Sequence, residues 1–585
     1  MRGCVYAKYY QDELLFLREL GREFARANPD AAPFLAESGT DPDVERLLEG
    51  FAFLTARIRQ KLDDELPEFT HALMEMFWPH YLRPIPSFTI VQFEATTQAA
   101  RESRVIARGA ELSSLPVDST PCTFRTTQDV NLQPVQLRAV EVHKGAVPQI
   151  VLRFRLPEGL TLDKVNLSSL RLYLAGEPPV TRALYLCLCR YARQITAMRE
   201  QLGGASQPIP LAGAKIKPVG LGESEGLLPY SRLSFPGFRL LQEYFAFPQK
   251  FMFVDITGLE GLQKGGLAGS FDLVIQLSRL PDNMPPVSLA NVALNCAPAV
   301  NLFKHDADPV RIDPRRTEYK VRPGGVDPAH FEIYTIDRVF GLTRGTAKPK
   351  DFRPLFRVGV AGAGGSYYRA RTENAIVGEG TDVFITPVSG GDVQGAEDVE
   401  TLSMELTCTN RQLPTRLGLG DISVLTSNSP QFARFRNITK PSASVPPPLG
   451  DDLHWRLLSH LSINYFSLLE VEALRSLLTL YNFRARVDRQ AENAHRLLLE
   501  GVQKVSSAPA TRMFMGAPVR GLDVEIEFNE DNLGGEGEVF LLGAVLSEFF
   551  AQYVSLNAFS RLKVRGVKRA EVHEYAARAG RRVML

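Results

Sequence analysis

The sequence predicts an α+β protein: an N-terminal helical segment, several β-rich domains resembling sandwiches or barrels, and a C-terminal domain of mixed structure. Apolar residues recur at helical spacing up to about residue 83. From residue 88 the apolar period changes to two, which is typical of strands. Helical spacing returns after a proline-rich stretch, "KPSASVPPPLG", near residue 445.

The first helix is predicted from an apolar stripe near the N-terminus. Tyr10, Leu14, Leu17 and Phe24 follow helical spacing and share one face. The helix should end before Pro29, because proline disfavours helical backbone in the residue that precedes it.

The second helix is predicted to begin at Asp41, a suitable N-cap, with Pro42 at the first helical position. A longer apolar stripe follows, and its spacing is nearly heptad in places. Its members are Val44, Leu47, Leu48, Phe51, Leu54, Ile58 and Leu62.

A third helix is predicted in "FTHALMEMFWPHYLRP", which Pro79 and Pro84 interrupt before the strand-like "FTIVQF". Two interpretations remain open for its apolar face. The helix either packs in the core of its own chain or joins a bundle with a partner.

The β-rich part contains strands such as "QIVLRFRL", in which apolar and basic residues alternate. Further along, "FRLLQEYFAFP" predicts a short helix, and "KFMFVDI" and "SFDLVIQLS" predict strands. A Gly- and Pro-rich stretch over 203–229 indicates a boundary or a long loop. We therefore expect four domains: a helical one over 1–85, β-rich ones over 86–225 and 226–445, and an α+β one over 446–585.

In the C-terminal domain "EVEALRSLLTLYNF" predicts a helix and "GLDVEIEFNE" a strand. A last helix is predicted in "EVFLLGAVLSEFFAQYVSLNAF". It places four apolar residues on one side: Phe540, Val545, Phe549 and Tyr553.

Composition argues against several functions. With 67 basic and 66 acidic residues the net charge is +1, which does not favour nucleic-acid binding. No apolar run reaches the ~20 residues of a membrane span, and the N-terminus lacks a signal-peptide core. The six cysteines are scattered, and Cys187 and Cys189, which are expected in a strand, form only a C-x-C pair without the spacing of a zinc site. We expect free thiols in the reducing cytoplasm.

Catalytic motifs are weak. The "GVAGAGG" loop at 359–365 lacks the following helix of a dinucleotide site. His305, with Asp306 and Asp308, is the most metal-like group, although these residues are also common in turns. Glu525 and Glu527 could pair as glycosidase carboxylates, but a solvated strand face explains them better. We therefore expect no enzyme activity, cofactor or metal.

Longer stretches resemble a known family. "YYQDELLFLRELGREFARANPDAAPFL", "SFPGFRLLQEYFAFPQKFMFVDI", "NCAPAVNLFKHDADP", "CTNRQLPTRL", "LHWRLLSHLSINYFSL" and "FNEDNLGGEGEVFLLGAVLSEFFAQYVSLNAFSRL" occur in order along nearly the whole chain. They are similar to the TssF family of type VI secretion baseplate proteins, also called VasA or ImpG.

The resemblance implies a fold like a phage baseplate wedge and a structural role without catalytic residues. Two TssF copies are expected to associate with one TssG and with each other. TssK would bind this wedge, with TssE nearby, around the VgrG spike and under the contractile sheath that delivers effectors. Such a chain would be cytoplasmic, docked at the inner membrane through its partners and not inserted in it.

If this is so, the N-terminal stripes should face a bundle shared between subunits. The expected interface residues are Leu14, Leu17, Phe24, Leu48, Phe51, Leu54, Ile58, Leu73 and Phe77. The alternative is that these helices pack only on their own chain. Two other functions stay open: a β-rich hydrolase or carbohydrate-binding protein with helical extensions, and a component of a phage tail-like particle.

Overall fold

The computed structural model describes parts of the first 73 residues and most of the chain that follows. Before residue 74 it describes 10–11, 13–20, 23, 26, 46–47, 49–56 and 71. From residue 74 onward it describes every residue except 76–77, 97–101, 163–164, 166, 200–206, 212, 231–233, 266–268, 314, 344–348, 356–365, 376–379, 390–398, 450–468, 515–516, 556 and 581–585.

The chain divides into two compact units. The smaller comprises residues 1–82 and 448–462, and the larger comprises 83–447 and 463–585. In the smaller unit the described residues of 10–26 and of 46–56 are helical, which confirms both predicted helices where they can be observed. This unit also contains the 3-10 helix η2 (Pro79–Leu82).

The larger unit contains a six-stranded antiparallel sheet that nearly closes on itself. Its strands, in spatial order, are β24 (Ile422–Val424), β3 (Glu111–Val117), β4 (Thr120–Thr126), β15 (Cys296–Val300), β1 (Phe88–Ala95) and β25 (Ala433–Asn437). The edge strands β24 and β25 meet because the Asn437 side chain accepts a hydrogen bond from the backbone N–H of Ile422 at 3.0 Å. A small ribbon, β2 (Arg104–Ile106) with β5 (Val130–Leu132), adds to the apolar core inside.

Two more sheets follow. One has the order β10 (Gln207–Pro210), β9 (Ala192–Arg199), β13 (Ser270–Leu277), β7 (Gln149–Arg155), β6 (Gln136–His143). The other has the order β11 (Lys215–Pro218), β12 (Phe253–Thr257), β8 (Ser169–Leu174), β14 (Val292–Leu294). The first three sheets thus draw strands from both sides of residue 225.

Helix α4 (Pro178–Leu186) starts with two prolines and continues into a π-helical turn, η4 (Cys187–Tyr191). The strand expected for Cys187 and Cys189 is therefore wrong. A short apolar run cannot by itself distinguish a buried helix from a strand, and here the prolines at the helix start decide. Helix α5 (Pro236–Ala246) and strands β12 and β13 form where the sequence predicts them.

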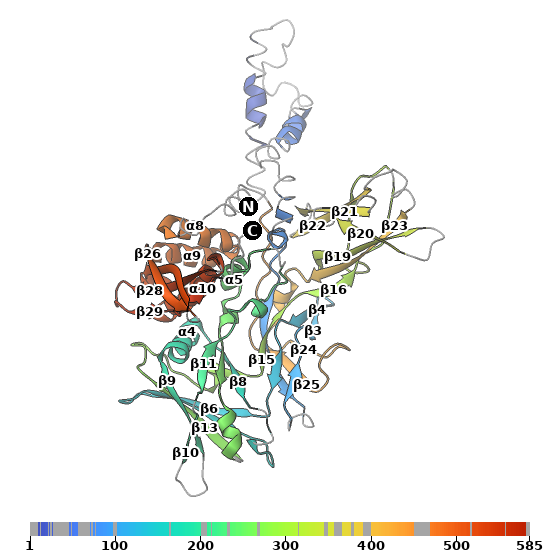
Figure 1. The fold of residues 1–585 in the computed structure, drawn as a ribbon. Coiled ribbons are helices and arrows are strands. Elements are labelled where there is room, and N and C mark those ends of the chain that lie inside the picture. Colours follow the sequence, from blue (N-terminus) through green and yellow to red (C-terminus); the bar gives the residue numbers. More distant parts are fainter. Residues whose placement is uncertain are drawn as a thin grey trace. The chain divides into compact units, whose positions relative to one another are not determined.

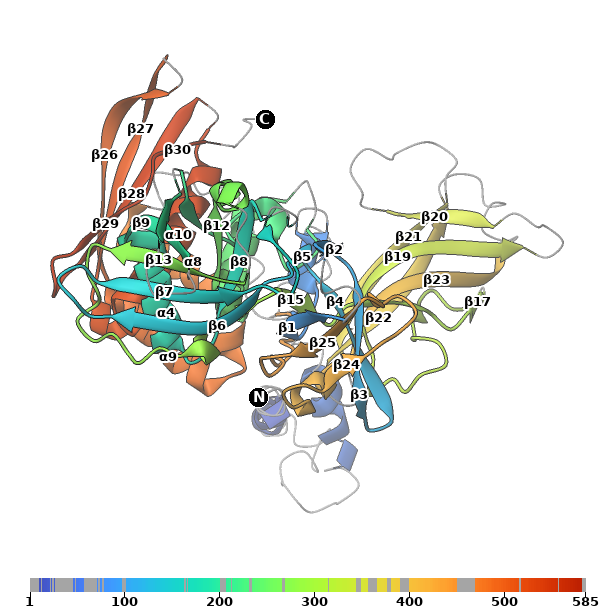
Figure 2. The ribbon, with the colours of Figure 1, turned by 90° about the horizontal axis from the view of Figure 1, so that it is seen from below.

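The fourth sheet surrounds a separate apolar core. Its order is β16 (Phe303–Asp306), β23 (Val399–Thr409), β19 (Glu332–Thr343), β20 (Lys350–Pro354), β21 (Ser366–Asn374), β22 (Thr381–Ser389), β18 (Tyr319–Lys320). The short β17 (Val310–Arg311) pairs with β23, at the rim of the sheet in Figure 2.

The C-terminal part contains helices α8 (Val471–Tyr481) and α9 (Arg489–Gly501) and a twisted sheet (Figure 1). The sheet order is β26 (Val502–Phe514), β27 (Ala517–Phe528), β28 (Ala558–Gly566), β29 (Val572–Glu574), and β30 (Arg578–Ala579) pairs with β28. Short 3-10 helices described in the larger unit include η5 (Glu223–Glu225), η6 (Pro248–Phe251), η7 (Glu260–Gly265), η8 (Leu289–Asn291), η9 (Leu413–Arg416), η11 (Arg484–Arg486) and η12 (Glu530–Leu533).

Helix α10 (Glu536–Tyr553) connects the parallel strands β27 and β28 and packs against β28, α5 and α4 (Figure 2). It confirms the predicted helix, but it is buried almost all round rather than on one side. It begins after Gly534 and Gly535, whose positive φ angles of 84° and 110° suit glycine and reverse the chain.

Among the described residues, we find no helix with the length and apolar character needed to cross a lipid bilayer.

Candidate functional site

The described part of the second N-terminal helix has two unlike faces. Leu47, Phe51 and Leu54 follow the spacing i, i+4, i+7 and are 74%, 59% and 60% exposed. The small side chains of Ala52 and Ala56 lie on another face and are fully buried. The chain therefore covers the small residues of this helix and leaves a stripe of large apolar side chains open to solvent.

The first helix also exposes apolar side chains. Leu15, Phe16 and Leu20 are largely exposed, whereas the predicted interface residues Leu14 and Leu17 are half-buried. Several exposed apolar side chains on neighbouring turns are unusual for a surface without a partner and are typical of a protein–protein interface.

Of the nine predicted interface residues, the structure places Phe51 and Leu54 together on the exposed stripe. Leu14 and Leu17 lie one turn apart on the first helix. The other five fall outside the described residues: Phe24, Leu48, Ile58, Leu73 and Phe77.

The end of the helical segment is anchored by aromatic side chains. Met74, Trp78 and Tyr81 are buried, and the Trp78 and Tyr81 rings meet edge to face with centroids 6.3 Å apart. The backbone N–H of Trp78 donates to the Met74 carbonyl oxygen at 2.6 Å. This part of the predicted third helix is held by apolar burial, in contrast to the exposed stripe of the second.

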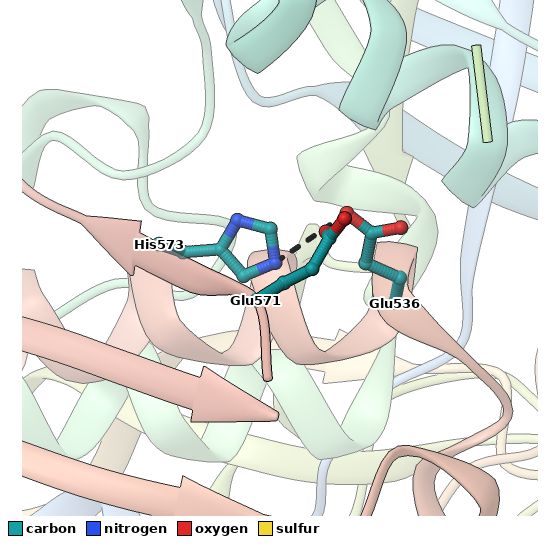
Figure 3. A group of neighbouring side chains, drawn as sticks. All are labelled: Glu536, Glu571 and His573. Carbon is teal, nitrogen blue, oxygen red and sulfur yellow. Dashed lines mark ion pairs between the residues drawn. The ribbon is translucent and has the colours of Figure 1, made fainter. Parts of the chain in front are cut away.

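A buried polar cluster lies at the start of α10 (Figure 3). Glu536 comes from the first turn of this helix, Glu571 from the turn before β29, and His573 from β29 itself. One donor atom from each lies within 4.8 Å of the others, and Figure 3 shows the three side chains pointing toward one another. Two carboxylates and an imidazole form a donor set that suits a divalent metal.

The charge in this cluster is already balanced from another part of the chain. The Arg279 guanidinium, which follows β13, donates to Glu536 at 2.8 Å and pairs with Glu571. It also lies over the ring of Tyr191, at 4.6 Å from the centroid, and the Tyr191 hydroxyl donates to Glu536. A metal ion would have to displace this arginine. We therefore interpret the cluster as an ionic connection between the C-terminal sheet and the preceding β-rich part.

Burial and the contact between the two carboxyl groups shift their pKa values in opposite directions. Burial, and then the hydrogen bond with Glu571, raises the pKa of Glu536 to about 7. Burial acts in the same direction on Glu571, but the hydrogen bond with Glu536 and the charge of Arg279 leave its pKa below the ordinary value. Burial lowers the pKa of His573 to about 4, so this imidazole is neutral near pH 7.

These shifts predict how stability depends on pH. Because the pKa of Glu536 is raised on folding, its contribution is fully present below the pKa of the unfolded chain and is lost as the pH rises through about 7. We expect most of this loss in Tm between about pH 4.5 and 7.5, and we expect the part between pH 6.5 and 7.5 to be smaller in Glu536→Gln, as measured by differential scanning fluorimetry.

The pKa values of His573 and His495 are lowered by burial, so these groups change stability only below about pH 6.5. The exposed Glu158→Gln serves as the control and should follow the wild type. Equal slopes for Glu536→Gln and wild type in this interval would contradict the raised pKa of Glu536.

A second carboxylate in the same turn of α10 is held in the same way. Glu538 pairs with Arg182 of α4 and accepts a hydrogen bond from the Tyr244 hydroxyl of α5 at 2.6 Å. Acidic side chains in the first turn of a helix also interact favourably with its dipole. Two Arg–Tyr pairs thus fix the start of α10 to the elements before it.

The candidate metal-binding and catalytic residues identified in the sequence have structural roles where the structure describes them. The His305 Nε2 forms a hydrogen bond with the Gly324 carbonyl oxygen at 2.9 Å. Glu525 pairs with Arg565 at 2.8 Å, and Glu527 lies 3.9 Å from Lys504. The glycine loop at 359–365 falls outside the described residues.

A polar cavity of about 390 Å³ lies where the near-closed sheet meets β8 and β12. Arg171 forms two hydrogen bonds of 2.8 Å with Asp255 in its wall and a third with Gln128 at 2.9 Å. The backbone N–H of Arg108 donates to the Asp129 carboxylate at 2.7 Å, and the Arg108 guanidinium donates to the Ser224 carbonyl oxygen at 3.3 Å. Because Arg171 and Asp255 neutralise each other, the cavity has the character of a junction between sheets.

Comparison with known proteins identifies the family. The profile described as "Type VI secretion system, TssF" matches residues 6–582. This chain belongs to the TssF family. It is 33% identical over 624 aligned residues to the type VI secretion system component TssF1 of Pseudomonas aeruginosa, with 98% of each chain covered. The resemblance that the sequence motifs indicated is confirmed.

Two solved structures share the TssF fold. One is described as the type VI secretion system TssK–TssF–TssG baseplate subcomplex. It has a TM-score of 0.76 and 31% identity, covering 92% of this chain and 99% of that one. The other is described as the baseplate complex from the type VI secretion system. It has a TM-score of 0.66 and 28% identity, covering 99% and 100%. The predicted wedge-like fold with mixed helices and strands is thereby confirmed, and β-sheets dominate it.

Sequence reasoning missed the Glu536–Glu571–His573 cluster. One signal was available: Glu571 and His573 are two residues apart in a strand-like stretch, which places them on the same face. The partners Arg279 and Tyr191 lie some 250 residues or more earlier in the chain, and no local pattern of the TssF sequence connects them.

Proposed function

We propose that this TssF-family chain is a structural subunit of the type VI secretion baseplate wedge and assembles with TssG and TssK. The observation that supports this most is the open stripe of Leu47, Phe51 and Leu54 on a helix whose small residues are already covered. We infer that the stripe packs against helices of TssG. Leu14 and Leu17, and the predicted interface residues outside the described part, would extend the same bundle.

Burial of the stripe in an interface would contribute favourably to the binding free energy. A large apolar side chain that is moved from water into a packed interface contributes about 1.5–3 kcal/mol. Three such residues on one helix provide a compact apolar centre of the kind that dominates binding at protein interfaces. Two similar solved structures are described as baseplate complexes. We therefore expect a subunit of that assembly to be the partner that covers the stripe.

We further propose the finer organisation that the family resemblance implies. Two copies of this chain would share one TssG, TssK would bind the resulting wedge, and TssE would lie close by. Six wedges would surround the VgrG spike and carry the sheath whose contraction delivers effectors. The chain would work in the cytoplasm and reach the inner membrane only through its partners.

We infer no catalytic role. An enzyme site needs an open pocket with converging reactive groups and perturbed pKa values. The perturbed carboxyl group described above, Glu536, is buried and neutralised by Arg279. A hydrolase or carbohydrate-binding function therefore has less support than a scaffold.

Co-purification tests the proposal directly. Affinity-tagged chain should be co-expressed with TssG and TssK from the same gene cluster and analysed by size-exclusion chromatography with native mass spectrometry. We expect one complex that contains all three proteins, with this chain in twofold excess over TssG. Expressed alone, the chain should self-associate through its exposed apolar stripe. A stable monomer that does not enter a complex with TssG would refute the proposal.

A further inference from the structure

The fourth sheet is spanned by a segment that we call the strap, residues 307–323. Its first part forms β17, which pairs with β23, and its last part forms β18, which pairs with β22. The ends of the strap meet at Ala307 and Pro323, which form an isolated β-bridge. The strap thus joins two strands that are far apart in the order of this sheet.

Hydrogen bonds tie together the described residues of the strap's turn, which lie on either side of residue 314. The hydroxyl of the buried Tyr319 accepts a hydrogen bond from the Asp313 N–H at 2.8 Å and donates to the Asp313 carbonyl oxygen at 2.7 Å. The Arg315 N–H donates to the Asp313 carboxylate at 3.0 Å, and the Arg316 N–H donates to the Asp313 carbonyl oxygen at 2.9 Å. These bonds hold the backbone of Arg315 and Arg316 close to Asp313.

Four arginines of the strap are exposed without a charge partner among the residues that the structure describes: Arg311, Arg315, Arg316 and Arg322. Other basic residues of the same sheet have one. Lys304 pairs with Asp337, Lys320 with Asp382 and Arg371 with Glu318, at 2.6–2.8 Å. The carboxylates of Asp337, Asp382 and Glu318 are thus engaged, and no ion pair joins the four guanidinium groups to a described carboxylate.

We propose that the strap is a docking site for a carboxylate-rich face of another protein subunit. A guanidinium group binds a carboxylate through two parallel hydrogen bonds. A turn held by hydrogen bonds loses little conformational entropy when it binds. Protein carboxylates fit better than nucleic-acid phosphates, because the chain as a whole carries a net charge of only +1. The partner's place in the baseplate rests on the proposed function, whereas the carboxylate binding does not.

Binding to fluorescein-labelled poly-L-glutamate tests the strap with the full chain alone. Fluorescence anisotropy should be measured for the wild type, for Arg315→Glu with Arg316→Glu, and for Lys215→Glu with Lys217→Glu on the exposed face of β11. Both variants change the net charge equally. We expect at least about tenfold weaker binding for the strap variant at ~0.1 M salt and less than about twofold for the control.

Several results would overturn the proposal. Equal losses in the two variants would show that only net charge matters. Tighter binding to a DNA duplex of equal charge than to poly-L-glutamate would assign the strap to nucleic acid. If the strap variant has a lower Tm than the wild type, Arg315→Gln with Arg316→Gln is measured instead. This variant must show the same selective loss of poly-L-glutamate binding. Because no baseplate subunit takes part, failure here leaves the proposed function untouched, and failed co-purification leaves the strap result standing.

Discussion

Replacing Phe51 by aspartate is expected to abolish assembly of the chain with TssG. The side chain is 59% exposed in the chain alone, so the change should leave the fold intact. In a helical bundle the new carboxylate would be buried without a partner, which costs several kcal/mol. Removal of a central interface side chain alone costs about 2 kcal/mol or more, which is roughly a 30-fold loss of affinity. Size-exclusion chromatography of the co-expressed proteins measures the result.

Val487→Asp is the matched control for this experiment. Val487 is 57% exposed and lies next to α9, in the larger unit of the chain. It tests whether any exposed apolar residue changed to aspartate disturbs assembly. Normal complex formation by the Phe51 variant, or an equal loss in the control, would remove the stripe from the interface.

Replacing Lys250 by methionine is expected to destabilise the larger unit strongly. Lys250 and Glu243 are 1% and 0% exposed and form a buried ion pair. Burial lowers the pKa of Lys250, and the neighbouring carboxylate opposes this change. Without the lysine a buried charge stays uncompensated, which costs about 3–5 kcal/mol. Differential scanning fluorimetry should show a clear drop in Tm.

The double variant Glu243→Gln with Lys250→Met should recover most of that loss. The Glu243 Oε1 accepts hydrogen bonds from the N–H groups of Leu227 and Leu228 at 2.7 and 3.1 Å. An amide oxygen can accept the same two bonds without leaving a buried charge. If the double variant were as unstable as Lys250→Met alone, packing of the lysine stem rather than its charge would explain the loss.

The spacing of apolar residues predicted helices and strands that are determined by residues close together in the sequence. Helices α5, α8 and α10 and strands β12, β13 and β27 lie close to where the apolar patterns place them. The start of α10 at Glu536, two residues before the predicted run, depends on the preceding glycine pair. These signals are local, so the sequence carries them directly.

Side-chain partners over long distances could not be predicted. Arg279 meets Glu536 from the segment after β13, Tyr191 meets it from η4, and Arg182 reaches Glu538 from α4. On the second N-terminal helix, periodicity placed Phe51 and Leu54 on one apolar stripe. It could not show that the chain buries Ala52 and Ala56 and leaves the larger residues open. Which of two faces a chain covers depends on tertiary packing, which a one-dimensional pattern does not contain.

The pairing of β1 with both β15 and β25 affects how the protein is made. Strand β1 leaves the ribosome first, but its second partner is translated about 340 residues later. At the usual 5–20 residues per second this delay is roughly 20–70 s. Until both partners are made, at least one edge of β1 stays unpaired, and this strand carries "FTIVQF", an apolar β-forming segment prone to aggregation. Production of this protein should therefore depend on chaperones that shield the N-terminal strand during translation.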